Sequence, residues 1–230
     1  MDLARFIQIY IVQGLFALFF LYLAILVLKR GKKKLNLYLS SFYLSTTMGG
    51  IINMIYATIF VEMIVFIMHF LTYYLFCFSM VFLLIFVLIL IRPDKQFKFK
   101  FQFVIILVFG LLILGMLLIP NGIIIDASTN WKPNWNWNFL IYSIIVCSFT
   151  VVCPTIYFSI KIYFKFESEY LKKKWKYFLF GIFAYFFLYY GTSISNTLND
   201  DAFRFIWSLI SLPTLISLYL LYYGIGRQLQ

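Results

Sequence analysis

Long uninterrupted apolar runs dominate the chain and predict helices that cross a membrane. Residues 6–28 contain no charged residue, and a run of lysines follows them without a small-residue cleavage site. About 20 apolar residues are enough to cross a bilayer core of about 30 Å. The run therefore predicts a retained first span and not a removed signal peptide.

The same criterion gives six further spans. The expected spans are residues 6–28, 37–60, 62–91, 103–119, 139–163, 177–195 and 203–223. The apolar stretch 51–91 is too long for one helix, so we divide it at a weak break next to Glu62. The prediction is an all-α fold, a seven-transmembrane-helix bundle that forms a single domain over residues 1–230. Without the break there would be six spans, and both termini would share a side.

Positive charges alternate between loops and predict the orientation. Lys and Arg crowd the first, third and fifth loops, whereas the amino terminus and the even loops hold only Arg5, Lys132 and Arg204. Cytoplasmic loops are enriched in Lys and Arg. We therefore expect a multi-pass protein of the cell membrane with its amino terminus outside and its carboxyl terminus in the cytoplasm. This sorting explains the net charge of +11 without a nucleic-acid partner.

Composition agrees with a chain embedded in the lipid bilayer and argues against an enzyme. Apolar residues make up 64% and charged residues 12%, against about half and about a quarter in soluble domains. The single histidine excludes His-based metal clusters and paired-His relays. The cysteines show neither metal spacing nor a disulfide framework. We expect no catalytic residue, cofactor or metal.

The third span carries the most informative polar residues. Glu62, His69 and Tyr73, with Phe66 between them, fall on one helical face and could line a cavity that opens outward. In the alternative interpretation, Glu62 ends the helix at the headgroups and His69 bonds a neighbouring helix. Asn53 of the second span would lie at the same depth as His69, although a small polar face there also suits helix packing.

The sixth and seventh spans add polar and aromatic residues to the same half of the bundle. The candidate ligand-binding residues from these spans are Tyr190, Ser193, Asn196 and Trp207. Together with the second and third spans they predict a polar, aromatic-lined pocket for a small amphipathic or apolar ligand. The fourth loop alternates Trp with Asn, which suits an interfacial aromatic belt or a flap over the pocket.

Two lysine runs form the strongest charge clusters of the expected cytoplasmic face. They are Lys32, Lys33 and Lys34, and Lys172, Lys173 and Lys174. They serve topology and attraction to anionic lipid headgroups, or they form a docking surface for an acidic cytoplasmic signalling protein.

Residues 37–45 resemble the matching helix of the seven-helix sensor modules at the front of archaeal and bacterial histidine kinases. Residues 172–181 resemble the basic entry into the sixth helix of those modules, and the order of spans agrees over nearly the whole chain. The resemblance implies an extracytoplasmic or membrane-borne stimulus but carries over no binding residue. A cytoplasmic signalling domain follows such modules and is missing here, so we expect output to pass to a separate protein.

The leading hypothesis is a non-enzymatic, receptor-like sensor that binds a small or lipid-like ligand in its outer half. It would signal through its basic cytoplasmic face. A small transporter or channel that uses the stripe from Glu62 to His69 is the first alternative. A structural subunit of a membrane complex is the second.

Overall fold

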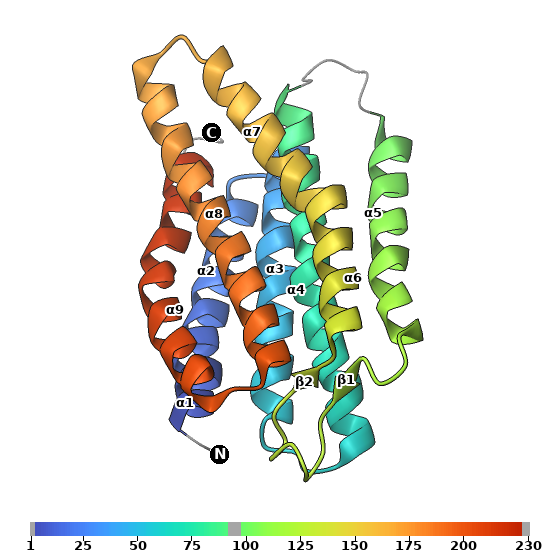
Figure 1. Cartoon of the computed structure of the whole chain (residues 1–230). Helices are drawn as coiled ribbons and strands as arrows, with labels where there is room; N and C mark the ends of the chain where they lie inside the picture. Colours follow the sequence, from blue (N-terminus) through green and yellow to red (C-terminus); the bar gives the residue numbers. More distant parts are fainter. Residues whose placement is uncertain (1–2, 92–97, 227–230) are drawn as a thin grey trace.

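The computed structural model describes residues 3–91 and 98–226, and they form a bundle of long helices that run up and down one axis (Figure 1). The helical elements are α1 (Leu3–Phe6), η1 (Ile7–Gln13), α2 (Gly14–Lys29), α3 (Lys34–Tyr56), α4 (Glu62–Ile91), α5 (Phe99–Leu114), η2 (Gly115–Leu118), α6 (Trp137–Cys147), η3 (Ser148–Val152), α7 (Cys153–Lys165), α8 (Glu169–Leu198), α9 (Asp201–Leu221) and η4 (Tyr222–Gly226). The expectation of an all-α fold is confirmed.

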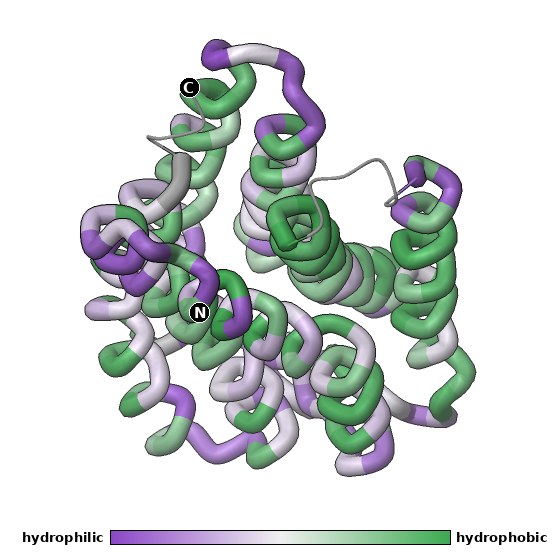
Figure 2. The backbone as a smooth tube through the Cα atoms, turned by 90° about the horizontal axis from the view of Figure 1, so that it is seen from above, coloured by the Kyte–Doolittle hydropathy of each residue, from purple (hydrophilic) through white to green (hydrophobic). Residues whose placement is uncertain are grey.

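Six helical rods in the described part of the chain are long and apolar enough to cross a membrane. They are α2 with η1, α4, α5 with η2, α6 with η3 and α7, α8, and α9 with η4. Seen along the axis, α5 stands at the rim of the bundle and is hydrophobic over most of its length (Figure 2). The long helices thus have the composition of membrane spans.

α3 is as long as these helices but more polar, and its polar side chains face other helices. Ser40 Oγ donates to the Ala24 carbonyl at 3.2 Å, and Thr47 Oγ1 donates to the Ala17 carbonyl at 3.3 Å. Its exposed hydrophobic residues are Leu37, Leu44, Met48 and Ile55. These four lie at helical spacing on one face. The low mean hydropathy of α3 therefore comes from its buried side and not from its outer surface.

A short β-hairpin lies in the region that the sequence analysis treated as a loop. Strands β1 (Ile123–Ile124) and β2 (Asn134–Trp135) pair antiparallel, with Ile123 opposite Trp135. Asn136 caps α6 directly after the hairpin, because its side-chain oxygen accepts from the Phe139 N–H at 2.8 Å. The hairpin is therefore fixed to the start of α6.

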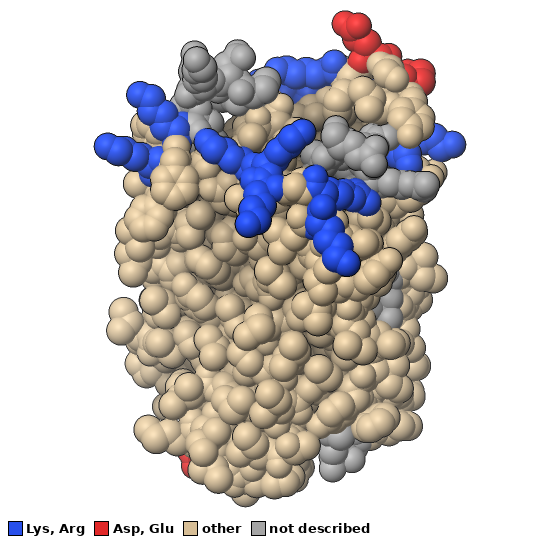
Figure 3. Space-filling view, turned by 180° about the vertical axis from the view of Figure 1, so that it is seen from behind, with Lys and Arg blue, Asp and Glu red and all other residues tan. Residues whose placement is uncertain are grey.

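The two ends of the bundle differ in charge. Lys and Arg gather at the end where α7 connects to α8 (Figure 3), which we call the basic end. The opposite end carries α1, the hairpin and the turn between α8 and α9 (Figure 1), and we call it the hairpin end. α8 begins at Glu169 and not near residue 177, so Lys172, Lys173 and Lys174 lie on a helix and not in a loop.

Candidate functional site

A cavity of about 440 Å³ lies in the hairpin half of the bundle, between η1, α3, α4, α8, α9 and β2. On α4 its lining runs from His69 to Met80, and on α8 it runs from Asn196 back to Tyr185. At 1.5 Å per residue, the α4 wall alone extends for about 16 Å. The cavity is therefore elongated along the bundle axis.

Most of the candidate ligand-binding residues lie on its wall. The lining includes Asn53, His69, Tyr73, Ser193, Asn196 and Trp207, and it does not include Glu62 or Tyr190. The structure thus brings together side chains from α3, α4, α8 and α9 that are far apart in the sequence.

Glu62 lies away from the cavity. It is exposed in the first turn of α4, about 10 Å along the helix from His69. Phe66, between them, lines a separate small pocket with Met116 and Phe139. The predicted polar stripe from Glu62 to His69 therefore divides between two surfaces, because α4 extends about two turns beyond the cavity wall.

Tyr190 also points elsewhere, and its neighbour Tyr189 occupies the wall instead. The Tyr190 hydroxyl hydrogen-bonds Ser148 Oγ at 2.6 Å, at the start of η3. Successive side chains on an α-helix differ by about 100° in direction. The correct choice between two adjacent tyrosines therefore required knowledge of the rotation of α8, which the sequence did not supply.

His69 joins three elements at the cavity wall. Its Nε2 accepts from the Trp135 indole N–H at 3.1 Å, and its Nδ1 lies 2.7 Å from the Tyr56 hydroxyl. An indole nitrogen only donates, so Nε2 carries no proton and the neutral ring holds its proton on Nδ1. His69 therefore both lines the cavity and ties α4 to α3 and the hairpin. Protonation of Nε2 would break the bond to Trp135.

The three tryptophans of the fourth loop have three different environments. Trp135 is 3% exposed and packs edge-to-face on Tyr73 and Phe139, with ring centroids 4.9 Å apart in both pairs. Trp131 packs on Phe60 at 5.5 Å. Only Trp137, at 59% exposed, has the exposure of an interfacial belt residue. Trp135 instead forms part of the cavity wall.

Hydroxyl groups at the deeper end of the cavity bond one another. Tyr73 hydrogen-bonds Ser143, and the Tyr189 hydroxyl lies 2.5 Å from Ser143 Oγ and 3.1 Å from the Tyr73 hydroxyl. The Tyr185 hydroxyl lies 2.6 Å from Ser79 Oγ. Because these hydroxyl groups bond one another, the wall at the deeper end of the cavity presents mainly aromatic rings and apolar side chains.

Two buried polar atoms on the wall differ from this pattern. Asn53 and Thr72 are 5% and 4% exposed, and both line the cavity. Asn53 Oδ1 and Thr72 Oγ1 form no hydrogen bond to any residue that the structure describes. The Asn53 amide donates only to Gln13. Both side chains line the cavity, but these two atoms are themselves fully buried, so a ligand can bond them only after the side chains rotate toward it.

Gln8 and Gln13 also line the cavity, from η1, and neither was among the predicted site residues. On an α-helix they would be about 140° apart, so helical periodicity does not group them. A π-helix bonds residue i to i+5, which brings residues five apart onto nearly one face. Gln8 accepts from Ser211 Oγ at 3.1 Å. A signal was present, because these are the only glutamines of the first span.

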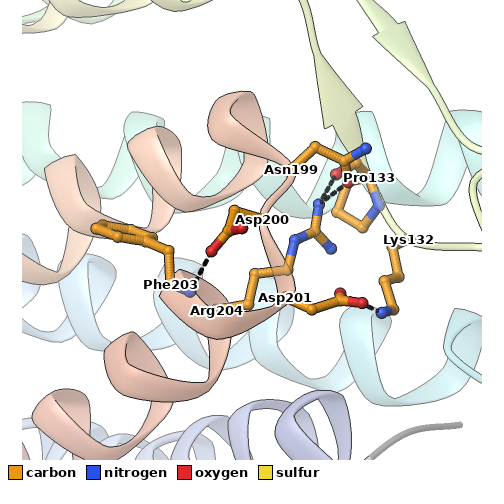
Figure 4. A network of polar contacts seen from close by, with 7 residues as sticks. All are labelled: Lys132, Pro133, Asn199, Asp200, Asp201, Phe203 and Arg204. Carbon is orange, nitrogen blue, oxygen red and sulfur yellow. Dashed lines mark hydrogen bonds and ion pairs between the residues drawn. The ribbon is translucent and has the colours of Figure 1, made fainter.

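Charged residues surround the mouth of the cavity at the hairpin end (Figure 4). Lys132 Nζ pairs with Asp201 at 2.7 Å. Arg204 donates to the Pro133 carbonyl at 2.7 Å and to Asn199 Oδ1 at 2.8 Å. Arg204, Lys132, Asp201 and Arg5 all line the cavity. The three cations that the sequence places outside the basic loops therefore meet at one site.

The lysines of the basic end are arranged differently. Lys32, Lys33, Lys34 and Lys173 are exposed. Lys172 pairs with Glu169 at 2.8 Å. Lys174 is 8% exposed, with its ammonium 3.5 Å from the ring centroid of Tyr223 and 5.7 Å from that of Tyr170. Lys174 is therefore packed between rings and does not present its charge on the surface, unlike the neighbours with which it was grouped.

The described residues hold no group of three or more His, Cys, Asp or Glu side chains that could bind a metal. Comparison with models of known protein families, with curated proteins and with solved structures finds no match. The resemblance to sensor modules of histidine kinases therefore stays a prediction.

Proposed function

We propose that the chain is a receptor-like integral membrane protein that binds a small amphipathic ligand in the cavity at its hairpin end. In this proposal it performs no chemistry, and it passes a signal through its basic end to a cytoplasmic protein. The hairpin end faces outside. The chain crosses the membrane seven times.

The unpartnered Asn53 Oδ1 and Thr72 Oγ1 carry this proposal. More than about 90% of buried polar groups in proteins are hydrogen-bonded, and an orphaned one costs about 1–3 kcal/mol. Two such atoms in side chains that line one cavity favour a ligand that bonds them when those side chains rotate toward it. The volume of about 440 Å³ also falls within the range of about 300–1,000 Å³ of small-molecule sites.

Seven crossings are supported by α3 and by the ends of the bundle. The exposed face of α3 is apolar, as contact with lipid requires, although on average α3 is less apolar than α2, α4 and α5. α1 and η4 lie at opposite ends of the bundle (Figure 1), which supports an odd number of crossings. The usual enrichment of Lys and Arg in cytoplasmic loops supports a cytoplasmic position for the basic end.

Cysteine labelling tests this topology. Ala127→Cys and Ala202→Cys place single thiols on exposed positions of the hairpin end, and Lys33→Cys places one at the basic end. Because the native Cys153 is exposed, the background carries Cys153→Ser. A membrane-impermeant maleimide should label the first two in intact cells and should label Lys33→Cys only after lysis. Labelling of Lys33→Cys in intact cells would overturn the orientation.

A matched pair of threonines tests ligand binding. Thr72 and Thr155 are both buried, and neither hydroxyl oxygen bonds a described residue, but only Thr72 lines the cavity. Thr72→Val should weaken saturable binding of tritiated dodecanol, whose hydroxyl can bond Thr72 Oγ1, to the protein in zwitterionic nanodiscs, measured above empty discs; dodecanoate is measured beside it. Thr155→Val should leave binding unchanged. If neither amphiphile binds saturably to the parent, the proposal fails.

The transporter alternative lacks a comparable observation. Glu62 lies outside the cavity, and the hydroxyls of Tyr73, Ser143 and Tyr189 bond one another at its deep end. Protein-dependent flux of dodecanoate into sealed liposomes would favour transport over sensing.

A further inference from the structure

The three cations of the hairpin end come from three distant segments and converge on one cavity. Arg5 belongs to α1, Lys132 precedes β2 and Arg204 lies in the first turn of α9, and all three line the cavity. Elsewhere at this end, the described residues include no Lys or Arg. Topology does not require such a cluster, because this side of the bundle is depleted of cations.

The lining of the cavity mouth is positive. Among the described residues, Asp201 is the only acidic residue that lines the cavity with the three cations. The side chain of Asp201 is 80% exposed, whereas that of Lys132 is 13% exposed. Charges near low-dielectric walls interact more strongly than charges in water, and a cleft lined by one sign of charge concentrates the opposite sign. The mouth therefore favours an anion.

Below the mouth the cavity is suited to a hydrocarbon chain. Its deeper lining includes Ile9, Val12, Phe16, Phe76, Met80 and Leu188. The elongated shape, about 16 Å along α4, matches one extended chain better than a compact ligand. A positive mouth and an apolar interior suit a ligand that has an anionic head and an apolar tail.

We propose that the cavity binds a single-chain anionic amphiphile. Its carboxylate or phosphate head lies between Arg5, Lys132 and Arg204, and its tail extends between α4 and α8 toward Met80. Guanidinium groups bond both kinds of oxyanion in bidentate geometry. This inference rests on the proposed function, for which it names the ligand class.

Binding of four probes that share one chain length tests the head group. The probes are tritiated dodecanoate, dodecyl phosphate, dodecanol and dodecyltrimethylammonium, each measured on the full chain in zwitterionic nanodiscs. Both anions should bind at least about tenfold more tightly than dodecanol, because hydrogen bonds to charged groups are the stronger ones. Inorganic phosphate should not displace dodecyl phosphate at equal concentration. Displacement by inorganic phosphate would assign the site to a free anion and overturn the amphiphile.

Removal of a positive charge at the mouth tests whether the named cations bind the anionic head. Arg5→Gln should weaken dodecanoate binding by about tenfold and leave dodecanol binding unchanged. Lys100→Gln, on the exposed start of α5 at the basic end, is the matched control and should change neither. Thermal unfolding identifies a variant that fails to fold. If Arg5→Gln does so, Lys132→Gln provides the same test from the hairpin.

A bulky residue in the deep wall tests the tail. Leu188→Trp should weaken dodecanoate binding but leave binding of the shorter hexanoate unchanged. Equal loss for both acids would overturn the placement of the tail.

The two proposals fail in different ways. If the anions, the alcohol and the ammonium bind equally and the charge variants change nothing, the anionic ligand is wrong while a binding cavity remains. If no probe binds saturably, the proposed function itself is wrong.

Discussion

The basic end and the hairpin end of the bundle use positive charge in opposite ways. The basic end has most of the Lys and Arg residues, and its lysines are spread over helix ends and turns or packed on rings, as Lys174 is on Tyr223. The hairpin end has three, and all of them line one cavity. The proposed orientation rests on the number of cations at each end, whereas the proposed ligand rests on their convergence at one cavity.

The two ends also differ in the hydrogen bonds that join their elements. At the basic end Arg30 hydrogen-bonds the Tyr222 hydroxyl, which links α2 to η4. At the hairpin end, the hydrogen bond from the Trp135 indole N–H to His69 Nε2 holds the hairpin against α4. The hairpin end therefore depends on a few polar contacts around a cavity, and changes there should affect both stability and binding.

The largest effect should come from His69→Ala. The substitution leaves the Tyr56 hydroxyl and the Trp135 indole N–H buried without His69, and each orphaned group costs about 1–3 kcal/mol. We expect a loss of about 2–4 kcal/mol in the free energy of unfolding, together with greater accessibility of Trp135. Denaturant unfolding and quenching of tryptophan fluorescence measure the two effects.

His69→Gln provides the control, because an amide can both accept from Trp135 and donate to Tyr56. It should recover part of the lost stability. A His69→Ala variant as stable as the parent would show that the hairpin is held by packing alone.

Gly191→Ala should have the next largest effect. A Cβ at residue 191 would lie 2.0 Å from the Trp207 ring, so the indole must move away from α8 and lose its bond to Thr192 Oγ1. Overpacking of this kind costs about 1–3 kcal/mol. Since Trp207 lines the cavity, the affinity for dodecanoate should fall as well. The double variant with Trp207→Leu should recover stability but not affinity, and a loss of stability unaffected by Trp207→Leu would contradict this mechanism.

Lys174→Met should destabilise the basic end by less. The ammonium lies over Tyr223 at 3.5 Å, and a cation–π contact contributes about 0.5–2 kcal/mol. Methionine keeps an unbranched stem and removes the charge. Lys173→Met, at an exposed neighbour, should leave unfolding unchanged but weaken binding to anionic vesicles, where each basic residue contributes about 1 kcal/mol. The reverse result, with Lys173 important for stability, would contradict the packing of Lys174.

The sequence predicted the helices better than their rotation about their own axes. Apolar runs of the required length specified the long helices, and charge alternation specified which loops share an end. The predicted helix ends were less accurate. α8 begins at Glu169 and includes the lysines that precede the predicted start at residue 177. A hydropathy criterion detects the apolar core of a helix but not its polar continuation into water.

The cavity was predictable in part, and the exceptions share a physical cause. Asn53, His69 and Trp207 are polar or amphipathic residues within apolar runs, which made them visible in the sequence. The direction of Tyr189 relative to Tyr190 depends on how α8 is rotated in the bundle. The grouping of Gln8 with Gln13 depends on a π-helix, which hydrophobic periodicity does not indicate.

The smallest effect concerns the tip of the hairpin and its pH dependence. The Ser128 hydroxyl donates to Asp126 Oδ1 at 2.6 Å, and the Thr129 N–H donates to it at 3.0 Å. These two bonds hold the pKa of the Asp126 carboxyl below its ordinary value of 3.8. A lowered carboxyl pKa stabilises the folded turn above the unfolded pKa, and this stabilisation is lost as the pH falls through the lowered value.

Hydrogen exchange of the 126–132 amides, corrected for intrinsic rates, should therefore accelerate below pH 3.8 and remain unchanged between neutral pH and that value. Asp126→Asn keeps an acceptor without the titrating proton, so its exchange should lack this acid step. An identical acid step in the variant would assign the transition to another group, and ionisation of Asp126 would then contribute nothing to the stability of the turn.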